Sequence, residues 1–176
     1  MNETQLTNLL GAMALALSDA QDAAARAASG LGTSACSALV VLNFYPGTPI
    51  RTLAEILGLT HSVVVRLTED LAGRGMVERS AGAKDKRQVQ LRLTLLGSET
   101  AAAILDARRA TLGAVLQRVP QDLRPALGDA VSHLLTALTQ SRASADHICR
   151  LCDEDACPQA CCPVECEAVR REGPRA

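Results

Sequence analysis

Apolar residues recur at helical spacing along most of the chain. Near the N-terminus, Leu6, Leu9, Leu10, Met13 and Leu17 follow one another every three or four positions, which places them on one face of a helix. The same spacing, ended by glycine or proline, predicts five further helices. The six predicted helices cover residues 4–28, 35–45, 50–58, 60–75, 95–119 and 122–146.

A different period follows the fourth helix. Val89, Leu91 and Leu93 alternate with polar residues, and this period of two predicts a half-buried strand. Residues 76–79 are its expected partner, with 80–87 as the hairpin tip. Because a lone hairpin is not stable in water, we expect it to pack against the preceding helices. The predicted fold class is therefore mainly α with a small β-hairpin.

Two of the helix starts carry capping signals. Thr48 and Pro49 are a plausible cap and first-turn pair for the helix over 50–58. Thr60 or Ser62 is the expected N-cap of the next helix, because hydroxyl side chains can accept a hydrogen bond from a free backbone N–H there.

Composition agrees with a helical fold. Hydrophobic residues make up 48% of the 176 residues, mostly Ala and Leu, and the only aromatic residues are Phe44 and Tyr45. Ala and Leu have high helix propensity. The length suits one compact domain, or a small domain carried on dimerisation helices.

The apolar N-terminal stretch resembles a signal peptide only superficially. Glu3 occupies a position where such peptides carry positive charge, and the first basic residue is Arg26. No apolar run reaches the roughly 18 residues that a membrane span needs. We therefore expect a cytoplasmic protein without a membrane partner, in a compartment where structural disulfides are rare.

Charge is distributed unevenly although the net charge is only −1. Residues 74–92 contain six basic and two acidic side chains, a local +4. Residues 146–167 contain six acidic side chains and Arg150, a local −5. The basic segment, which includes the hairpin, is therefore the part suited to a polyanion such as DNA.

The order of helix, tight corner, helix and basic hairpin is typical of a winged helix-turn-helix, in which one helix enters the major groove and the hairpin contacts phosphates. The sequence over about residues 50–97 resembles the DNA-binding core of the MarR family of transcription regulators. The resemblance includes the wing signature "DKR" (85–87) and the "LT..G" (93–97) that closes the second wing strand.

This resemblance implies roles for individual residues. The recognition helix would run from Thr60 to Leu71, and the hairpin would be the wing, in which Asp85 holds the turn while Arg87 enters the minor groove. The residues expected to face DNA are Thr60, His61, Ser62, Val65, Arg66, Glu69, Lys84, Asp85, Lys86 and Arg87.

The resemblance also implies an organisation and partners. Residues 1–47 and 98–146 would form a helical dimerisation region, 48–97 the winged helix-turn-helix, and 147–176 an acidic, cysteine-rich tail. The protein would bind double-stranded DNA as a homodimer on a palindromic operator, as a repressor rather than an activator. A small-molecule effector would bind between the two regions.

Simpler interpretations compete with some of these roles. His61 suits an ordinary polar position near a helix start. Arg66 has two possible ion-pair partners on its own helix, Glu69 and Asp70. The three wing cations suit a solvated turn as well as a DNA contact.

Six cysteines crowd the last part of the chain, at Cys149, Cys152, Cys157, Cys161, Cys162 and Cys166. The first two form a C-x2-C pair, the usual knuckle of a structural zinc site, whereas the later spacings do not repeat it. Iron–sulfur ligation uses the same atoms. The sequence predicts a metal site of these six residues, with zinc as the expected metal.

A redox switch and an unstructured, incidentally cysteine-rich tail remain open beside the metal site. Neighbouring cysteines can form disulfides that shift the last helix. The acidic residues around them favour a bound cation and disfavour a thiolate, which favours metal over redox chemistry. Cys36 is separate, in an apolar stretch, and is expected to be a buried small hydrophobe.

An enzyme is the competing class of protein. The segment "CRLC" (149–152) has the form used by thiol oxidoreductases, but there the motif follows a strand, whereas here it follows a long helix. No phosphate loop, paired-carboxylate cleft or Ser/His/Asp arrangement is visible, and His133 is isolated on a helix. We therefore expect no catalytic residues, with a thiol–disulfide or metal-handling protein as the alternative function.

Overall fold

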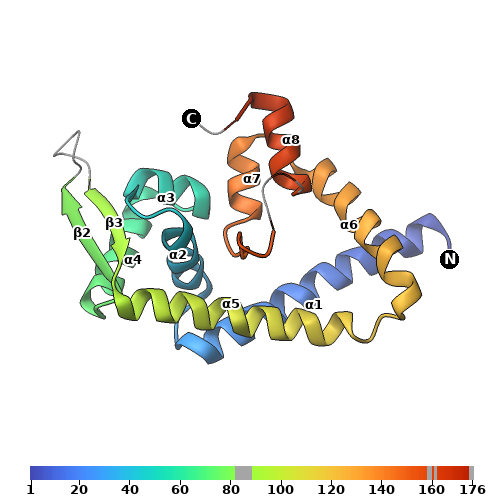
Figure 1. Ribbon diagram of the computed structural model, residues 1–176, viewed down its shortest axis with the longest axis horizontal. Coiled ribbons are helices and arrows are strands. Elements are labelled where there is room, and N and C mark those ends of the chain that lie inside the picture. Colours follow the sequence, from blue (N-terminus) through green and yellow to red (C-terminus); the bar gives the residue numbers. More distant parts are fainter. Residues whose placement is uncertain (82–88, 158–159, 161, 175–176) are drawn as a thin grey trace.

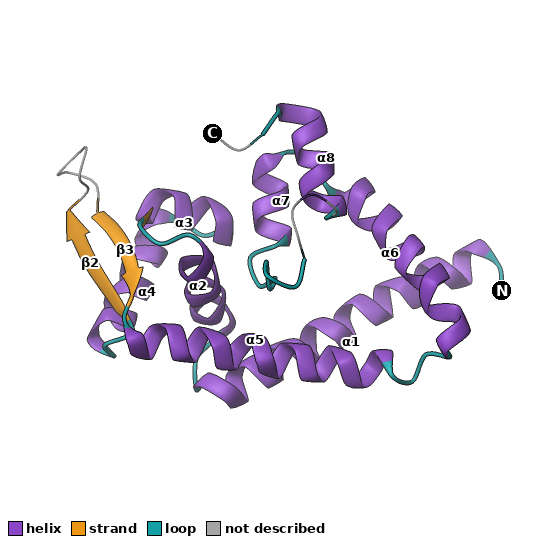
Figure 2. Ribbon diagram, in the orientation of Figure 1, coloured by secondary structure: helices purple, strands orange, loops and turns teal. Residues whose placement is uncertain are grey.

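The computed structural model describes residues 1–81, 89–157, 160 and 162–174. Helices make up most of the chain, with one small antiparallel sheet at one end (Figure 1, Figure 2). The mainly α fold class with a β-hairpin is confirmed, and a short additional strand, β1, was not predicted.

Three helices form the frame of the molecule: α1 (Glu3–Ser29), α2 (Thr33–Phe44) and α5 (Leu95–Leu116). Every residue of α2 from 35 to 42 is buried, so this helix is apolar on all sides and lies in the core. Helix α1 runs alongside α5 (Figure 1). The largest fully buried side chains of the core are Leu39, Leu42, Leu53, Leu71, Leu91 and Ile104.

The helix-turn-helix consists of α3 (Ile50–Leu57) and α4 (His61–Gly73). Gly58 makes the corner between them with φ 65°, a left-handed conformation that costs a glycine little. Its N–H donates to the carbonyl of Glu55, and the N–H of Leu59 donates to that of Ala54. The two helices are therefore joined by a tight turn, as the sequence predicted.

A three-stranded sheet packs beside these helices in the order β1-β3-β2, with every pair antiparallel. Its strands are β1 (Thr48–Pro49), β2 (Val77–Ala81) and β3 (Val89–Leu93). Leu91, the central residue of β3, is fully buried, which confirms the predicted half-buried strand. Thr48 pairs with Leu91, so the predicted helix cap is a strand residue, and Pro49 takes the N-cap position of α3 without a side-chain cap.

The "LT..G" motif joins β3 to α5. The Thr94 hydroxyl accepts from the Gly97 N–H at 3.1 Å, which caps α5, and donates to the Gly75 carbonyl at 2.6 Å. A Cβ on Gly97 would lie 2.0 Å from the carbonyl oxygen of Met76. The motif therefore fixes where α5 starts relative to the sheet.

The single helix predicted over 122–146 is wrong. The chain instead forms a 3-10 turn η1 (Gln121–Leu123), then α6 (Arg124–Leu138), and a separate helix α7 (Arg142–Ile148). Thr139 is extended at the break, and Ser141 starts α7 with a capping box that it shares with Ser144. Local side-chain capping therefore replaces the helical hydrogen bonds at 139–141.

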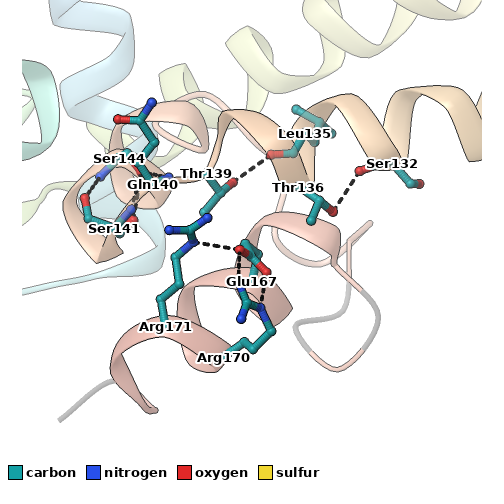
Figure 3. A network of polar contacts seen from close by, with 10 residues as sticks. All are labelled: Ser132, Leu135, Thr136, Thr139, Gln140, Ser141, Ser144, Glu167, Arg170 and Arg171. Atoms are coloured by element: carbon teal, nitrogen blue, oxygen red, sulfur yellow. Dashed lines mark hydrogen bonds and ion pairs between the residues drawn. The ribbon is translucent and has the colours of Figure 1, made fainter.

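The cysteine tail, residues 147–176, is folded over much of its length. Helix α8 (Pro163–Glu172) packs against α6 and α7 (Figure 1). Figure 3 shows Glu167 of α8 accepting hydrogen bonds from Arg170 and Arg171, beside the α6–α7 break at Thr139. A small second core of Ala145, Cys162, Val164 and Ala168 holds these helices together.

One end of the molecule is poorly covered. Residues 1–16, which include the first part of α1, are all exposed, and α6 buries no residue at all. No single described helix is long and apolar enough to cross a membrane; α1 and α2 would pass that test together, but they are bent by 76° and α2 is the core helix.

Candidate DNA-binding face and cysteine cavity

Helix α4 presents one polar face outward. Val64, Thr68 and Leu71 are fully buried and fix the orientation of the helix on the core. The opposite side exposes His61, Ser62, Arg66 and Glu69, and Thr60 is exposed at the N-cap position. The Thr60 hydroxyl lies 3.3 Å from that of Ser62 and makes no side-chain cap hydrogen bond.

Val65 differs from the other residues predicted to face DNA. It is half-buried and packs against the hydrophobic core, because it lies one position after Val64 and leans toward the same side. Val63 is 42% exposed and takes the apolar place on the outer face. The spacing of apolar residues alone did not show which of the three consecutive valines, Val63 to Val65, faces outward.

Both of the ion-pair partners considered for Arg66 are engaged elsewhere. Glu69 pairs with Arg79 of β2 at 3.2 Å, and Asp70 pairs with Arg74 at 2.8 Å. Arg66 is exposed, and none of the described residues forms a hydrogen bond or ion pair with its side chain. On α4, Arg66 is therefore an exposed guanidinium with no partner among the described residues.

The four predicted wing residues, Lys84, Asp85, Lys86 and Arg87, lie outside the described residues. The strands on either side of them are described, and the Arg79–Glu69 ion pair ties β2 to α4. Arg92 of β3 is exposed on the same hairpin. The wing therefore starts next to the exposed face of α4.

The second site is a cavity of about 250 Å³ between α5, α7, α8 and the end of α2. We call it the cysteine cavity. Four sulfurs line it, from Cys149, Cys152, Cys157 and Cys162, and its apolar wall includes Leu135, Ile148 and Val164. Its polar lining residues are Tyr45, Arg108, Glu154 and Glu165.

Cys149 and Cys152 form a hydrogen-bonded pair at the end of α7. The Cys152 N–H donates to the Cys149 carbonyl at 2.8 Å, which closes a turn. The Cys149 thiol donates a hydrogen bond to the Cys152 sulfur, which lowers the pKa of Cys152 to about 7 and, with burial, raises the pKa of Cys149. Cys152 is therefore the sulfur of the pair that ionises first.

Arg108 of α5 adds to this effect and was missed by the sequence analysis. Its charge and a hydrogen bond favour the ionised form of Cys152, and Gln21 of α1 holds its Nε at 2.7 Å. Arg108 lies 44 residues before Cys152 in the chain, so no local pattern connects them. The expectation that the surroundings disfavour a thiolate is wrong for Cys152.

The acidic residues of the tail are also paired. Asp153 binds Arg109 of α5 at 2.5 Å, Glu165 binds Arg142 of α7 at 2.5 Å, and Glu154 accepts from the Tyr45 hydroxyl at 2.8 Å. The sequence counted these carboxylates as a block of negative charge. Folding neutralises two of them with arginines from other elements.

The cysteine tail contacts the helix-turn-helix directly. Nδ1 of His147 in α7 lies 2.8 Å from the carbonyl oxygen of Ile56 in α3, and the ring lies against Gly58 at the corner. Tyr45, which holds Glu154, ends α2 just before β1. The tail therefore contacts both the end of α2 and the helix-turn-helix.

Comparison with known proteins agrees with the DNA-binding face. Residues 29–88 match a family model described as MarR family. The HTH-type transcriptional regulator PetP of Rhodobacter capsulatus is 32% identical over 77 residues, which are 44% of this chain and 46% of PetP. Over these residues the chain is similar to the MarR family, as the resemblance in the sequence implied.

Solved structures share the fold of this chain. The RV1404 structure from Mycobacterium tuberculosis has a TM-score of 0.71 at 18% identity, with 80% of this chain and 97% of that chain covered. Streptococcus pneumoniae FabT, solved in complex with DNA, has a TM-score of 0.68 at 16% identity, with 78% of this chain and 97% of that chain covered.

The family match does not extend to the cysteines. It ends at residue 88, and the PetP match covers less than half of either protein. The cysteine cavity is therefore interpreted from this chain's own residues.

The zinc prediction stays a prediction. Within the described residues, no three His, Cys, Asp or Glu side chains lie close enough together to hold a metal ion, and no disulfide links the described cysteines. Cys161, one of the six predicted ligands, lies outside the described residues. The described part of the set fits a pair of interacting thiols better than a tetrahedral site, which needs four close ligands.

Cys36 and His133 belong to neither site. Cys36 is 1% exposed in the core, as predicted, and burial raises the pKa of its thiol. His133 is exposed on α6.

Proposed function

We propose that the protein is a sequence-specific regulator of transcription that binds double-stranded DNA as a homodimer in the cytoplasm. The observation that carries this proposal is the exposed face of α4, where Arg66 has no described partner, next to the base of a basic hairpin. FabT, which shares the fold, was solved on DNA. In this fold a helix enters the major groove and the wing contacts the backbone.

A dimer explains the uncovered end of the molecule. The exposed stretch of α1 carries Leu6, Leu9 and Met13, and α6 carries Val131 and Leu134, all at least 40% exposed. Apolar stripes of this kind are stabilised when a second copy covers them. Two recognition helices related by a twofold axis read a palindromic operator.

We propose that the regulator is a repressor whose operator binding responds to an effector through the cysteine tail. The contact between His147 and Ile56 supports this, because a change in the tail acts directly on α3. Zinc bound by the cysteines, oxidation of the cysteines, and a small molecule in the cavity are the three candidate signals. Each would bias the position of α3 and α4 relative to the dimer helices.

The test begins with selection of an operator from a random-sequence DNA library by the reduced, full-length protein. Affinity for the selected duplex is then measured against salt concentration, for the wild type and for a Lys86→Ala, Arg87→Ala double variant. Loss of phosphate contacts reduces the slope of log affinity against log salt by about one to two. Arg26→Ala, on exposed α1, is the control.

Two results would contradict the proposal. Failure of the reduced protein to enrich any sequence would remove the regulator function. If the protein enriches an operator but the double variant keeps the wild-type salt slope, the wing does not contact DNA, and α4 remains as the predicted DNA-binding element.

A thiol–disulfide or metal-handling protein is the second candidate, and the Cys149–Cys152 pair is the observation that favours it. Its position argues against catalysis. Cys149 caps the C-terminal end of α7, where the helix dipole disfavours a thiolate, whereas the motif of oxidoreductases lies at a helix N-terminus. Insulin reduction with turnover by this protein would support the second candidate over the first.

A further inference from the structure

We infer that Cys152 and Cys149 form a thiol–disulfide exchange site, at which a low-molecular-weight disulfide oxidises the pair and weakens operator binding. This inference rests on the proposed function and deepens it. It assigns the response to two of the six cysteines and to one chemical class of oxidant.

The turn geometry suits an intramolecular disulfide. Cys149 caps α7 and its carbonyl accepts from the Cys152 N–H at 2.8 Å, so the two residues are the ends of a closed turn. The Cα atoms at the ends of such a turn lie within about 7 Å of each other. Disulfides need Cα atoms about 4.4–6.8 Å apart, so the bond forms with little backbone movement.

The cavity supplies the nucleophile and the space for its reagent. Both sulfurs of the pair line the cavity together with Arg108, which places a cation in the same cavity as the attacking sulfur. The cavity of about 250 Å³ beside both sulfurs has an apolar wall that includes Leu135, Ile148 and Val164. One half of a small disulfide can therefore remain attached to Cys152 during the reaction.

The reaction balances without a metal or cofactor. The Cys152 thiolate attacks one sulfur of RSSR, the S–S bond breaks, and RS⁻ leaves as a thiolate that takes a proton from water. Cys149 then loses its proton and attacks the Cys152 sulfur, which forms the Cys149–Cys152 bond and releases the second RSH. Two protein thiols are oxidised by two electrons, and RSSR is reduced to two RSH.

Oxidation is coupled to α3 through the residues around the pair. His147, two residues before Cys149, contacts the Ile56 carbonyl, and Arg150, inside the turn, donates to the His147 carbonyl at 2.6 Å. Glu154, two residues after Cys152, accepts from Tyr45 at the end of α2. Tightening the turn into a disulfide ring shifts both contacts, and with them the helix-turn-helix.

The experiment uses the full-length, reduced protein and its selected operator, with oxidised glutathione as the probe. Peptide mapping by mass spectrometry is expected to find a Cys149–Cys152 bond, and operator affinity is expected to fall about tenfold, within the usual range of coupling between sites. Dithiothreitol is expected to restore it. Cys149→Ser should stop the reaction at a glutathionyl adduct on Cys152, and Cys152→Ser should prevent it.

The control variant is Cys166→Ser, because Cys166 is exposed on α8 and does not line the cavity. It is expected to form the disulfide and lose operator affinity like the wild type. A thiol-reagent titration against pH in the Cys149→Ser and Cys152→Ser variants shows which sulfur reacts first and does not depend on DNA.

Three outcomes would overturn the inference. In the first, oxidised glutathione leaves the pair reduced whereas hydrogen peroxide oxidises it, which would show that the oxidant belongs to another chemical class. The disulfide forms but operator affinity is unchanged, which separates the chemistry from regulation. A chelator changes operator affinity while the pair does not react, which assigns the cysteines to a metal. If the reduced protein selects no operator, the proposed function fails, whereas peptide mapping still tests the disulfide.

Discussion

Gly97 lies where α5 meets the turn before β2, and its missing side chain is a structural requirement. A Cβ there would lie 2.0 Å from the Met76 carbonyl oxygen, a backbone atom that cannot rotate away. We expect Gly97→Ala to lower the free energy of unfolding by about 2–3 kcal/mol, the usual cost of overpacking. Urea denaturation of the wild type and the variant measures this change in the free energy of unfolding.

Gly113 provides the control on the same helix, because nothing lies within 4 Å of a Cβ built there. Gly113→Ala should leave stability unchanged or raise it by about 0.5–1 kcal/mol, since alanine favours helix. Equal effects of the two substitutions would show that the contact with Met76 is not what selects glycine at 97.

Arg66 of α4 is exposed and has no partner among the residues that the structure describes. Because Glu69 and Asp70 are paired with Arg79 and Arg74, Arg66→Ala breaks no ion pair of the described structure. We expect unchanged thermal stability and a loss of about 1–3 kcal/mol in the free energy of operator binding. Wild-type operator affinity in this variant, measured by fluorescence anisotropy, would remove Arg66 from the interface.

At the scale of elements, the period of apolar residues predicted the helices and strands that have one exposed and one buried face. It placed α1, α4 and β3 closely, because their apolar residues repeat without interruption. It missed the break in 122–146, because the capping box of Ser141 and Ser144 occupies positions that also suit a helix. It also missed β1, whose two residues pair only with a distant strand.

The candidate site residues were also predicted only in part from the sequence. Residues of α4 were predictable because they follow one another on a single helix. The environment of Cys152 was not, because Arg108 comes from α5 and is held by Gln21 of α1. Contacts between elements distant in sequence leave no local pattern, so the charge around the cysteines was judged from neighbours in the chain alone.

Helix α8 is expected to depend on pH through Glu167. Hydrogen bonds from Arg170 and Arg171 lower the pKa of Glu167 from 4.5 to about 2 (Figure 3). Since the folded-state pKa is depressed, the stabilisation is complete above about pH 4.5 and is lost as pH falls toward 2. Amide hydrogen exchange in α8, corrected for intrinsic rates, should therefore lose protection over this interval.

Glu167→Gln should remove this pH dependence, because glutamine does not titrate. Glu172→Gln, at the exposed end of the same helix, is the matched control and should keep the wild-type profile. A wild-type profile in Glu167→Gln would assign the transition to other carboxylates.

At the scale of the whole molecule, the tail lies between the helix-turn-helix and α6 (Figure 1). Helix α7 contacts α3, and Arg109 of α5 binds Asp153, so the tail touches both the helix-turn-helix and α5. A signal received in the cysteine cavity reaches α3 through contacts of one or two residues. A change in the chemical state of the tail would therefore act on the helix-turn-helix, as the proposed function requires.

The uncovered apolar helices lead to the last prediction, a dimer that a charged residue disrupts. Leu9 of α1 and Leu134 of α6 are 49% and 40% exposed, and neither residues 3–16 of α1 nor α6 bury a residue within one copy. Isolated helices have marginal stability in water, so the exposed parts of α1 and α6 need a surface to pack against. The wild type should sediment as a dimer, and Leu9→Asp with Leu134→Asp as a monomer.

The charge added by aspartate needs its own control. Asn8→Asp adds the same charge beside Leu9 but on the polar face of α1, so it should remain dimeric. The double variant should also lose affinity for a full palindrome much more than for a half-site, because one recognition helix remains intact in each monomer. A wild-type monomer at micromolar concentration, or an Asn8→Asp variant as monomeric as the double variant, would contradict the assignment of this face. A monomeric double variant with full palindrome affinity would show that the two half-sites are bound independently.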